Sequence, residues 1–283
     1  MLTVLEAINL STEFLGNKEI ESPRINAELL LAHALNCRRI DLYLSYDRPL
    51  SEDEIKIYRE FIRRRSKSEP LQYITGKVEF YGLQFKVNPS VLIPRQETEI
   101  LIETIISTVS IEDKIKILDV GTGSGNISVS LAKHLPNSMI TTIDNSESAL
   151  ETAKENANLL QVSGQIIFLN HDINSESILN ERFDIVVSNP PYISKDEFPE
   201  LKDELKVFEP KAALTDFADG LNYFRIISAK SKYLLGSNGK IFFEVGQGQA
   251  NEVRKILTEN NFSEISVVKD YLKIDRVISG IKK

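Results

Sequence analysis

The chain has 283 residues, 42% hydrophobic and 27% charged, a composition typical of globular proteins with one or two domains. Its net charge of −7 gives no general attraction to nucleic acid, and no apolar run approaches the ~20 residues of a membrane span. The first residues lack signal-peptide features, so we expect a cytoplasmic protein. One cysteine, Cys37, excludes an internal disulfide, and three scattered histidines indicate no metal site.

Residues 1–75 predict a small helical domain. The segment RINAELLLAHAL, just after Pro23, repeats apolar residues at helical spacing, and Ser51 is followed three residues later by Glu54, a capping-box signature. The basic run at residues 63–67 fits a solvated helix face or a contact with an acidic partner. Residues 1–75 contain 11 Lys or Arg and 12 Asp or Glu, so this domain, at −1, is no cationic arm for nucleic acid.

Residues 76–93 predict a β-hairpin linker, because apolar and polar residues alternate around Gly82 without helical periodicity. In residues 94–283, strand-like runs such as KIKILDV, MITTID, FDIVVSN and GKIFFEVG alternate with helical patterns, which predicts a mostly parallel sheet covered on both faces.

The last two strands predict a reversal. Only five residues separate Asp270 from Arg276, whereas a parallel connection needs a crossover of about a dozen. The final strand must therefore run antiparallel. A seven-stranded α/β sheet ending in an antiparallel hairpin resembles the Rossmann-like, class I S-adenosylmethionine-dependent methyltransferase fold.

A glycine-rich turn follows the first strand of this sheet. The sequence DVGTGSG at residues 119–125 leads into a helix, a context that favours a nucleotide ligand over a tight structural turn. The next strand ends at Asp144, where a carboxylate can accept both ribose hydroxyls. Asp119 could bind an ammonium group of the ligand or brace the turn.

The third strand leads to Asp172 and Ile173. The Asp172 carboxylate can accept from the exocyclic amine of an adenine, and Ile173 can cover the ring. The alternative for Asp172 is a helix cap.

The fourth strand runs into the tetrapeptide NPPY, residues 189–192, at the carboxyl edge where ligands bind in open α/β sheets. The side-chain oxygen of Asn189 and the carbonyl of Pro190 are two acceptors for a planar NH2 group, and Tyr192 offers an aromatic face. An amide nitrogen is a poor nucleophile, so acceptors that position it and stabilise its developing positive charge suit methyl transfer. The alternative is a structural loop.

The sequence resembles the bacterial peptide-chain release factor glutamine methyltransferases nearly from end to end. The similar segments are RINAELLLAHAL at residues 24–35, EPLQYITGKVEFYGLQFKVNPSVLIPRQETE at 69–99, DVGTGSGNISVSLAK at 119–133 and FDIVVSNPPYI at 183–193, with EPKAAL, DGLNYFRII and IDRV farther on. VLIPRQETE together with the helical front domain is the most restrictive feature.

The resemblance implies that the acceptor is the glutamine amide in the Gly-Gly-Gln loop of class 1 release factors and that the cofactor is S-adenosylmethionine. It assigns the cofactor to Gly121, Thr122, Gly123, Ser124, Gly125, Asp144, Ile173 and Asn189, to which the adenine argument above adds Asp172. It assigns the acceptor glutamine to Asn189, Pro190, Pro191 and Tyr192, and we expect Asn189, Pro190 and Tyr192 to be catalytic. Arg95, Glu97, Thr98 and Glu99 would cap the methionine end or shape the acceptor mouth, or begin a helix.

Two alternative functions fit the sequence less well. A nucleic-acid amino methyltransferase predicts a basic target domain, and a non-catalytic binding module predicts a degraded glycine turn or NPPY. We expect a monomer whose partner is a release factor, without nucleic-acid or membrane contacts. The front domain would recognise the body of that factor, because a short loop offers too little surface for selectivity.

Overall fold

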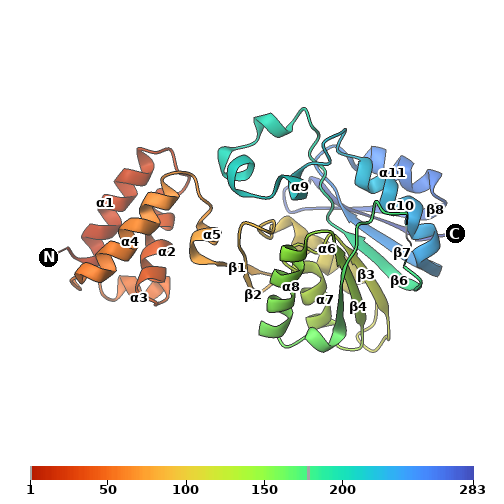
Figure 1. The fold of residues 1–283 in the computed structure, drawn as a ribbon, viewed down its shortest axis with the longest axis horizontal. Coiled ribbons are helices and arrows are strands. Elements are labelled where there is room, and N and C mark those ends of the chain that lie inside the picture. Colours follow the sequence, from red (N-terminus) through yellow and green to blue (C-terminus); the bar gives the residue numbers. More distant parts are fainter. Residues whose placement is uncertain (1, 177–178) are drawn as a thin grey trace. The chain divides into compact units, whose positions relative to one another are not determined.

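The computed structural model describes residues 2–176 and 179–283. These residues form two units (Figure 1). One comprises the chain up to Lys77 together with Lys202–Phe208, and the other comprises Val78–Leu201 and Glu209–Lys283. No helix in the described ranges is both long and apolar enough to cross a membrane.

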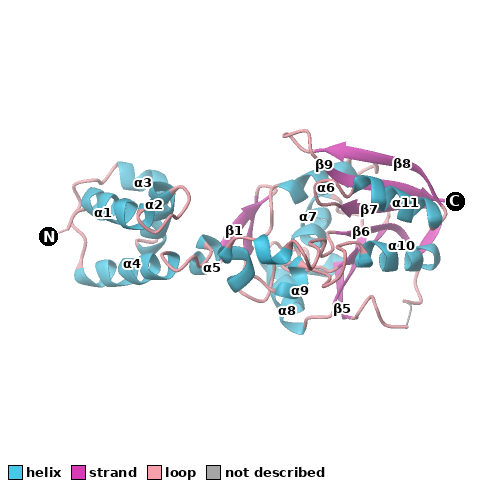
Figure 2. Cartoon of the chain, turned by 90° about the horizontal axis from the view of Figure 1, so that it is seen from above, coloured by secondary structure: helices cyan, strands magenta, loops and turns pink. Residues whose placement is uncertain are grey.

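The first unit is helical, as predicted (Figure 2). The capping box at the start of α4 (Glu52–Arg65) is present: Ser51 Oγ accepts from Glu54 N at 3.3 Å, and Glu54 Oε2 accepts from Ser51 N at 2.8 Å. One apolar core includes Ile8, Leu30, Leu31, Leu42 and Tyr58. The helices are α1 (Val4–Gly16), α2 (Pro23–Ala34), α3 (Arg39–Tyr43), α4 (Glu52–Arg65) and α5 (Leu71–Thr75).

The basic run at the end of α4 is not simply a solvated face. Arg65 is 5% exposed and donates to Asn26 Oδ1 at 2.7 Å and to Glu204 Oε2 at 2.9 Å. Lys202 pairs with Glu21 at 2.5 Å. These bonds tie the segment Lys202–Phe208, which contains the π-helix η3 (Glu204–Phe208), to the helical unit.

The predicted β-hairpin is formed by β1 (Lys77–Phe80) and β2 (Leu83–Lys86). Its two turn residues, Tyr81 and Gly82, both have positive φ, the backbone that suits a two-residue hairpin turn. Glu99 Oε1 accepts from Tyr81 N at 2.8 Å, so a carboxylate of α6 (Glu97–Ile106) fixes the turn.

The second unit contains a seven-stranded sheet in the order β5-β4-β3-β6-β7-β9-β8. Five neighbouring strands are parallel, and β9 runs antiparallel between β7 and β8, which confirms the predicted reversal. The strands are β3 (Lys116–Val120), β4 (Met139–Asp144), β5 (Ile166–Asn170), β6 (Phe183–Ser188), β7 (Leu235–Glu244), β8 (Phe262–Lys269) and β9 (Asp275–Lys282).

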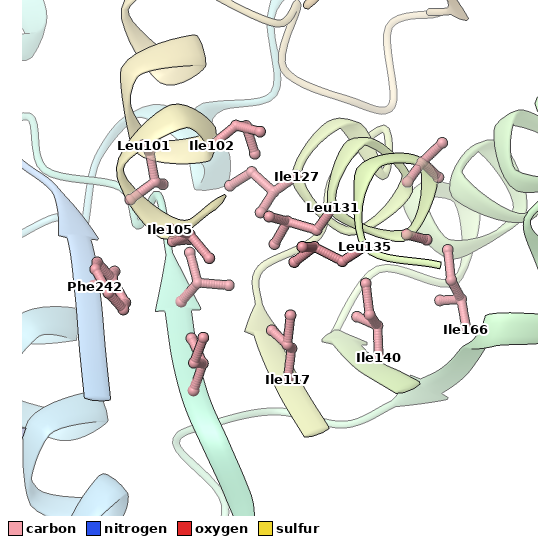
Figure 3. Close-up of a cluster of buried hydrophobic side chains, with 14 of the residues drawn as sticks. Leu101, Ile102, Ile105, Ile117, Ile127, Leu131, Leu135, Ile140, Ile166 and Phe242 are labelled. Atoms are coloured by element: carbon pink, nitrogen blue, oxygen red, sulfur yellow. The ribbon is translucent and has the colours of Figure 1, made fainter. Parts of the chain in front are cut away.

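Successive side chains of the strands enter two cores, because strand side chains alternate between the faces of a sheet. Ile117 and Phe242 contribute to one core, and their neighbours Leu118 and Phe243 contribute to the other. Figure 3 shows the first core, where Leu101 and Ile105 of α6 and Leu131 of α7 (Asn126–His134) meet the sheet. The helices on this face are α6, α7 (Asn126–His134) and α8 (Glu147–Leu159).

The opposite face is covered by α10 (Asn222–Leu234) and α11 (Ala250–Glu259), whose buried apolar side chains belong to the second core. The remaining described elements are short: η1 (Ser163–Gln165), η2 (Phe198–Glu200) and α9 (Lys211–Leu214). Helical patterns at residues 124–134, 147–160, 221–235 and 250–260 predict α7, α8, α10 and α11 within two residues at each end. The sequence predicted only a possible start for α6.

The strand order reverses between β3 and β6. From β3 the chain continues to β4 on one side, and from β6 it continues to β7 on the other. Ligands bind at the carboxyl edge of such a reversal, because the connections there lead away in opposite directions. The glycine turn and the NPPY tetrapeptide follow these two strands directly.

A glycine allows α7 and α8 to pack closely, and its replacement should destabilise the second unit. Gly125 has φ +80°, and an added Cβ would lie 3.0 Å from Ala153 Cβ. We expect Gly125→Ala to lower the free energy of unfolding by about 1 to 3 kcal/mol in urea denaturation. Gly248→Ala is the matched control, because Gly248 has a similar φ of +86° but its added Cβ would meet no atom within 4 Å. Equal unfolding midpoints would contradict the packing argument.

Candidate active site

A cavity of about 240 Å³ lies at the carboxyl edge of the sheet. Most of the residues that the sequence singled out contribute to its wall, although they come from loops far apart in the chain. Those lining it are Gly121, Thr122, Gly123, Ser124, Asp144, Asp172, Ile173, Asn189, Pro190 and Pro191. Gly125 and Tyr192 are not in the wall.

The glycine turn has a backbone that only glycine adopts easily. Gly121, Gly123 and Gly125 have φ of +80°, +53° and +80°. The amides of Gly121 and Thr122 both donate to Ile143 O, at 2.9 and 3.2 Å, which joins the turn to β4. A Cβ at Gly121 or Gly123 would meet no atom within 4 Å, so φ rather than crowding requires these two glycines.

Asp144, the last residue of β4, also holds the turn. Its Oδ2 accepts from Gly123 N at 3.0 Å and its Oδ1 from Ser146 N at 2.9 Å. Burial raises the pKa of this carboxyl, and the backbone donors oppose the shift. A carboxylate oxygen can accept more than one hydrogen bond, so Asp144 can still receive hydroxyl donors from the cavity.

Asp119 braces the turn from behind. It is fully buried, outside the cavity wall, and its Oδ2 accepts from Thr122 Oγ1 at 3.0 Å and Thr142 Oγ1 at 3.1 Å. Burial raises its pKa to about 6. Its Oδ1 has no hydrogen-bond partner among the described residues, so a carboxylate with an unpaired oxygen lies directly behind the turn.

Asp172 and Ile173 lie together on the wall, as expected for a polar edge beside an apolar surface. Asp172 Oδ1 accepts from the backbone and side-chain nitrogens of Asn174, both at 2.8 Å. This arrangement is a turn, and the described residues next to it form no helix that Asp172 could cap. Ile173 is 7% exposed and packs in the second core.

The NPPY loop is attached to the neighbouring strand end. Ser188 Oγ, at the end of β6, donates to Val120 O at 2.7 Å, which ties β6 to the start of the glycine turn. Asn189 Nδ2 donates to Thr98 Oγ1 at 3.2 Å. Pro190 and Pro191 place rigid backbone along the cavity wall.

Tyr192 lies outside the cavity wall. Its hydroxyl donates to Glu244 Oε1 at 3.3 Å, and its ring packs against the second core rather than lining the cavity. Burial raises the pKa of the phenol. Gln249 Nε2 donates to the Tyr192 carbonyl at 2.8 Å, so both ends of the residue are fixed.

Four of the five residues of the RQETE segment, residues 95–99, have separate contacts. Arg95 lines the cavity and pairs with Glu209, whose other oxygen accepts from Ile93 N at 3.1 Å. Glu97 begins α6, and Glu99 fixes the hairpin turn. Thr98 Oγ1 donates to Glu244 Oε2 at 2.6 Å. The segment therefore serves the helix start, the cavity wall and the support of Asn189 together.

Glu244 was not identified from the sequence. It ends β7 and is 1% exposed, and burial raises its pKa to about 7. Its signal is an acidic residue that directly follows the apolar run IFF at the carboxyl end of a predicted strand. Within the described ranges, His, Cys, Asp and Glu side chains form no cluster that could hold a metal.

Comparisons with known proteins cover both units. Residues 6–76 match the PrmC N-terminal domain, and residues 95–205 match the methyltransferase small domain. In the crystal structure of a methyltransferase from Pyrococcus furiosus, the similar region covers 71% of this chain and 90% of that one, with a TM-score of 0.53 and 16% identity. This similarity and the strand order confirm the predicted class I methyltransferase fold.

Full-length relatives are more similar. A release factor glutamine methyltransferase from Fusobacterium nucleatum is 41% identical over 98% of this chain and 78% of its own length. One from Chlorobaculum tepidum is 39% identical over 98% of this chain and 96% of its own. The identity extends through the helical unit and the cavity alike, so this chain belongs to the release factor glutamine methyltransferase family.

Proposed function

We propose that this protein transfers a methyl group from S-adenosylmethionine to the side-chain amide nitrogen of the glutamine in the Gly-Gly-Gln motif of class 1 release factors, and so modulates translation termination. One observation carries the proposal: the glycine turn after β3 and the Asn-Pro-Pro backbone after β6 line the same cavity. A methyl donor and an amide acceptor can therefore meet at one switch point.

The glycine-turn side of the cavity fits the cofactor. The open space over Gly121 and Gly123 would admit a ligand close to the backbone, Asp144 would accept ribose hydroxyls, and Asp172 with Ile173 would hold the adenine. Asp119, with its unpaired buried oxygen, supplies negative potential that favours a cationic ligand. When bound, S-adenosylmethionine supplies an electrophilic sulfonium methyl.

Cofactor binding should depend on Asp144. Removing its carboxylate leaves two ligand hydroxyls and two backbone amides without acceptors, so we expect Asp144→Ala to bind S-adenosylmethionine at least about tenfold more weakly by calorimetry. Asp184→Ala is the matched control, because its carboxylate also accepts from a backbone amide, Lys116 N, but at the amino end of the strands. Unchanged affinity in folded Asp144→Ala would refute the ribose assignment.

The NPPY side fits an amide acceptor. Asn189 Nδ2 is already committed to Thr98, which leaves Asn189 Oδ1 to accept a proton of the glutamine NH2 group. The carbonyl of Pro190 would accept the other. Two acceptors hold the nitrogen toward the methyl donor and stabilise the positive charge that develops on it. The methylated nitrogen is acidic and loses its extra proton to water without a dedicated base.

Methyl transfer should therefore depend on Asn189 more than cofactor binding does. We expect Asn189→Ala to lower the single-turnover rate about 100-fold, the usual loss when an oriented polar partner is removed from an active site. Calorimetry on the same variant should give a smaller change in S-adenosylmethionine affinity. A transfer rate close to that of the wild type would eliminate the acceptor-holding role.

We propose that residues 1–75 recognise the release factor, that residues 76–93 form a β-hairpin linker, and that residues 94–283 carry out methyl transfer. A glutamine in a short loop presents little surface, so selectivity needs a second contact on the body of the release factor. We propose that the protein acts in the cytoplasm as a monomer, without nucleic acid or membrane. Its net charge of −7 supports a protein partner over nucleic acid.

If the protein contacts both the Gly-Gly-Gln loop and the body of the release factor, kcat/KM should differ strongly between whole factor and a loop peptide. Whole release factor should be methylated with a kcat/KM at least about 100-fold above that of an isolated peptide carrying the Gly-Gly-Gln loop, because the peptide lacks the second contact. Transfer of labelled methyl groups to both substrates measures this ratio. Equal values would contradict recognition beyond the loop.

The direct test of the activity is incorporation of labelled methyl groups into purified class 1 release factor. Wild-type protein should label the factor, and a factor whose Gly-Gly-Gln glutamine is replaced by alanine should remain unlabelled. Labelling of the replaced factor, or of nucleic acid in its place, would overturn the proposed substrate.

A further inference from the structure

A chain of three hydrogen bonds runs from the cavity wall into the interior of the second unit. Asn189 Nδ2 donates to Thr98 Oγ1 at 3.2 Å, Thr98 Oγ1 donates to Glu244 Oε2 at 2.6 Å, and Tyr192 Oη donates to Glu244 Oε1 at 3.3 Å. Thr98 and Glu244 are each 1% exposed and belong to different elements, α6 and β7. Neither the glycine turn nor the tetrapeptide explains why these two polar residues are buried here.

The number of available protons determines which way each group faces. An ionised Glu244 has only acceptor oxygens, so the single hydroxyl proton of Thr98 must be donated to it. The Thr98 oxygen can then only accept, and the atom that Asn189 presents to it must be the NH2 group. Asn189 Oδ1 accepts no hydrogen bond from the described residues, so it is left for the cavity that Asn189 lines.

We propose that Thr98 and Glu244 are positioning residues that fix the Asn189 amide so that its oxygen, rather than its nitrogen, faces the acceptor nitrogen. This inference rests on the proposed function, in which Asn189 accepts from the glutamine NH2 group. A reversed Asn189 amide would present a donor to a donor, so the two groups would repel instead of aligning for transfer.

The orientation of the Asn189 amide depends on whether Glu244 is ionised or protonated. A protonated Glu244 can donate to Thr98, which frees the Thr98 hydroxyl to donate to Asn189 Oδ1 and so reverses the amide. The groups that influence Glu244 are Thr98 and Glu97 on α6, Tyr192 in the loop and Arg276 on β9. Arg276 lowers the pKa of Glu244 and Glu97 raises it, but burial dominates and raises it to about 7.

Three variants separate positioning from packing. Thr98→Val keeps the shape without the hydroxyl and should lower kcat/KM for release factor by about tenfold to 100-fold, with S-adenosylmethionine affinity unchanged. Thr98→Ser restores the hydroxyl and should retain wild-type transfer within about threefold. Wild-type transfer by Thr98→Val, or equal losses in both Thr98 variants, would overturn the proposal.

The pH profile gives the second test. Wild-type kcat/KM should rise with pH through about 7, because Glu244 must be ionised. In Glu244→Gln this rise should be absent, because the amide cannot ionise. Ionisation of Asp119, whose pKa is about 6, would produce a separate change in kcat/KM at lower pH in both proteins. Persistence of the rise near 7 in Glu244→Gln would contradict the assignment.

A spectroscopic measurement separates this inference from the proposed activity. In 15N-labelled protein, the side-chain NH2 signals of Asn189, identified by their loss in Asn189→Ala, should shift with pH around 7 in the wild type and not in Glu244→Gln. This result needs no methyl transfer and decides the inference even if Thr98→Val does not fold. Failure to methylate release factor would refute the function alone, whereas pH-independent Asn189 signals in the wild type would refute the positioning role.

Discussion

The reversal of strand order between β3 and β6 is the constraint on which the site depends. Parallel strands end at one edge of the sheet, and the connections after β3 and β6 lead to opposite sides. The cavity therefore forms where two loops that are more than 60 residues apart in sequence follow two adjacent strands, β3 and β6. The alternating cores on the two faces of the sheet hold these strand ends in place.

The polar groups beneath the site are costly for stability. Asp119 and Glu244 are both buried, and burial raises the pKa of each well above that of a carboxyl group in water. Each accepts from threonine hydroxyls: Thr122 and Thr142 at Asp119, and Thr98 at Glu244. A purely apolar interior would be easier to fold, so these carboxyls are best explained by the loops that they support.

Much of the fold was predictable from local pattern. The order of strands and helices, the hairpin at Tyr81 and Gly82 and the antiparallel end of the sheet all follow from periodicity and connection length, and the structure contains them. The glycine turn and Asn189 were predictable as cavity residues because each directly follows a strand that the sequence pattern identifies.

Contacts between distant segments were not predictable. The sequence presents Arg65 as one of several basic residues on a helix face. In the structure it is buried against Asn26 and Glu204, and Glu204 lies 139 residues farther along the chain. Glu244 acquires its role only when α6 brings Thr98 to it, 146 residues away in sequence. Tyr192 likewise reads as an aromatic surface for the acceptor, whereas packing against the second core places it outside the cavity wall.

The central claim is that the two loops at one switch point bring a methyl donor to a glutamine amide. The most direct measurement is tandem mass spectrometry of class 1 release factor after incubation with this protein and S-adenosylmethionine carrying an isotopically labelled methyl group. The account predicts one labelled methyl on the side-chain nitrogen of the Gly-Gly-Gln glutamine. A label on any other residue or atom, or no label on the factor, would contradict it.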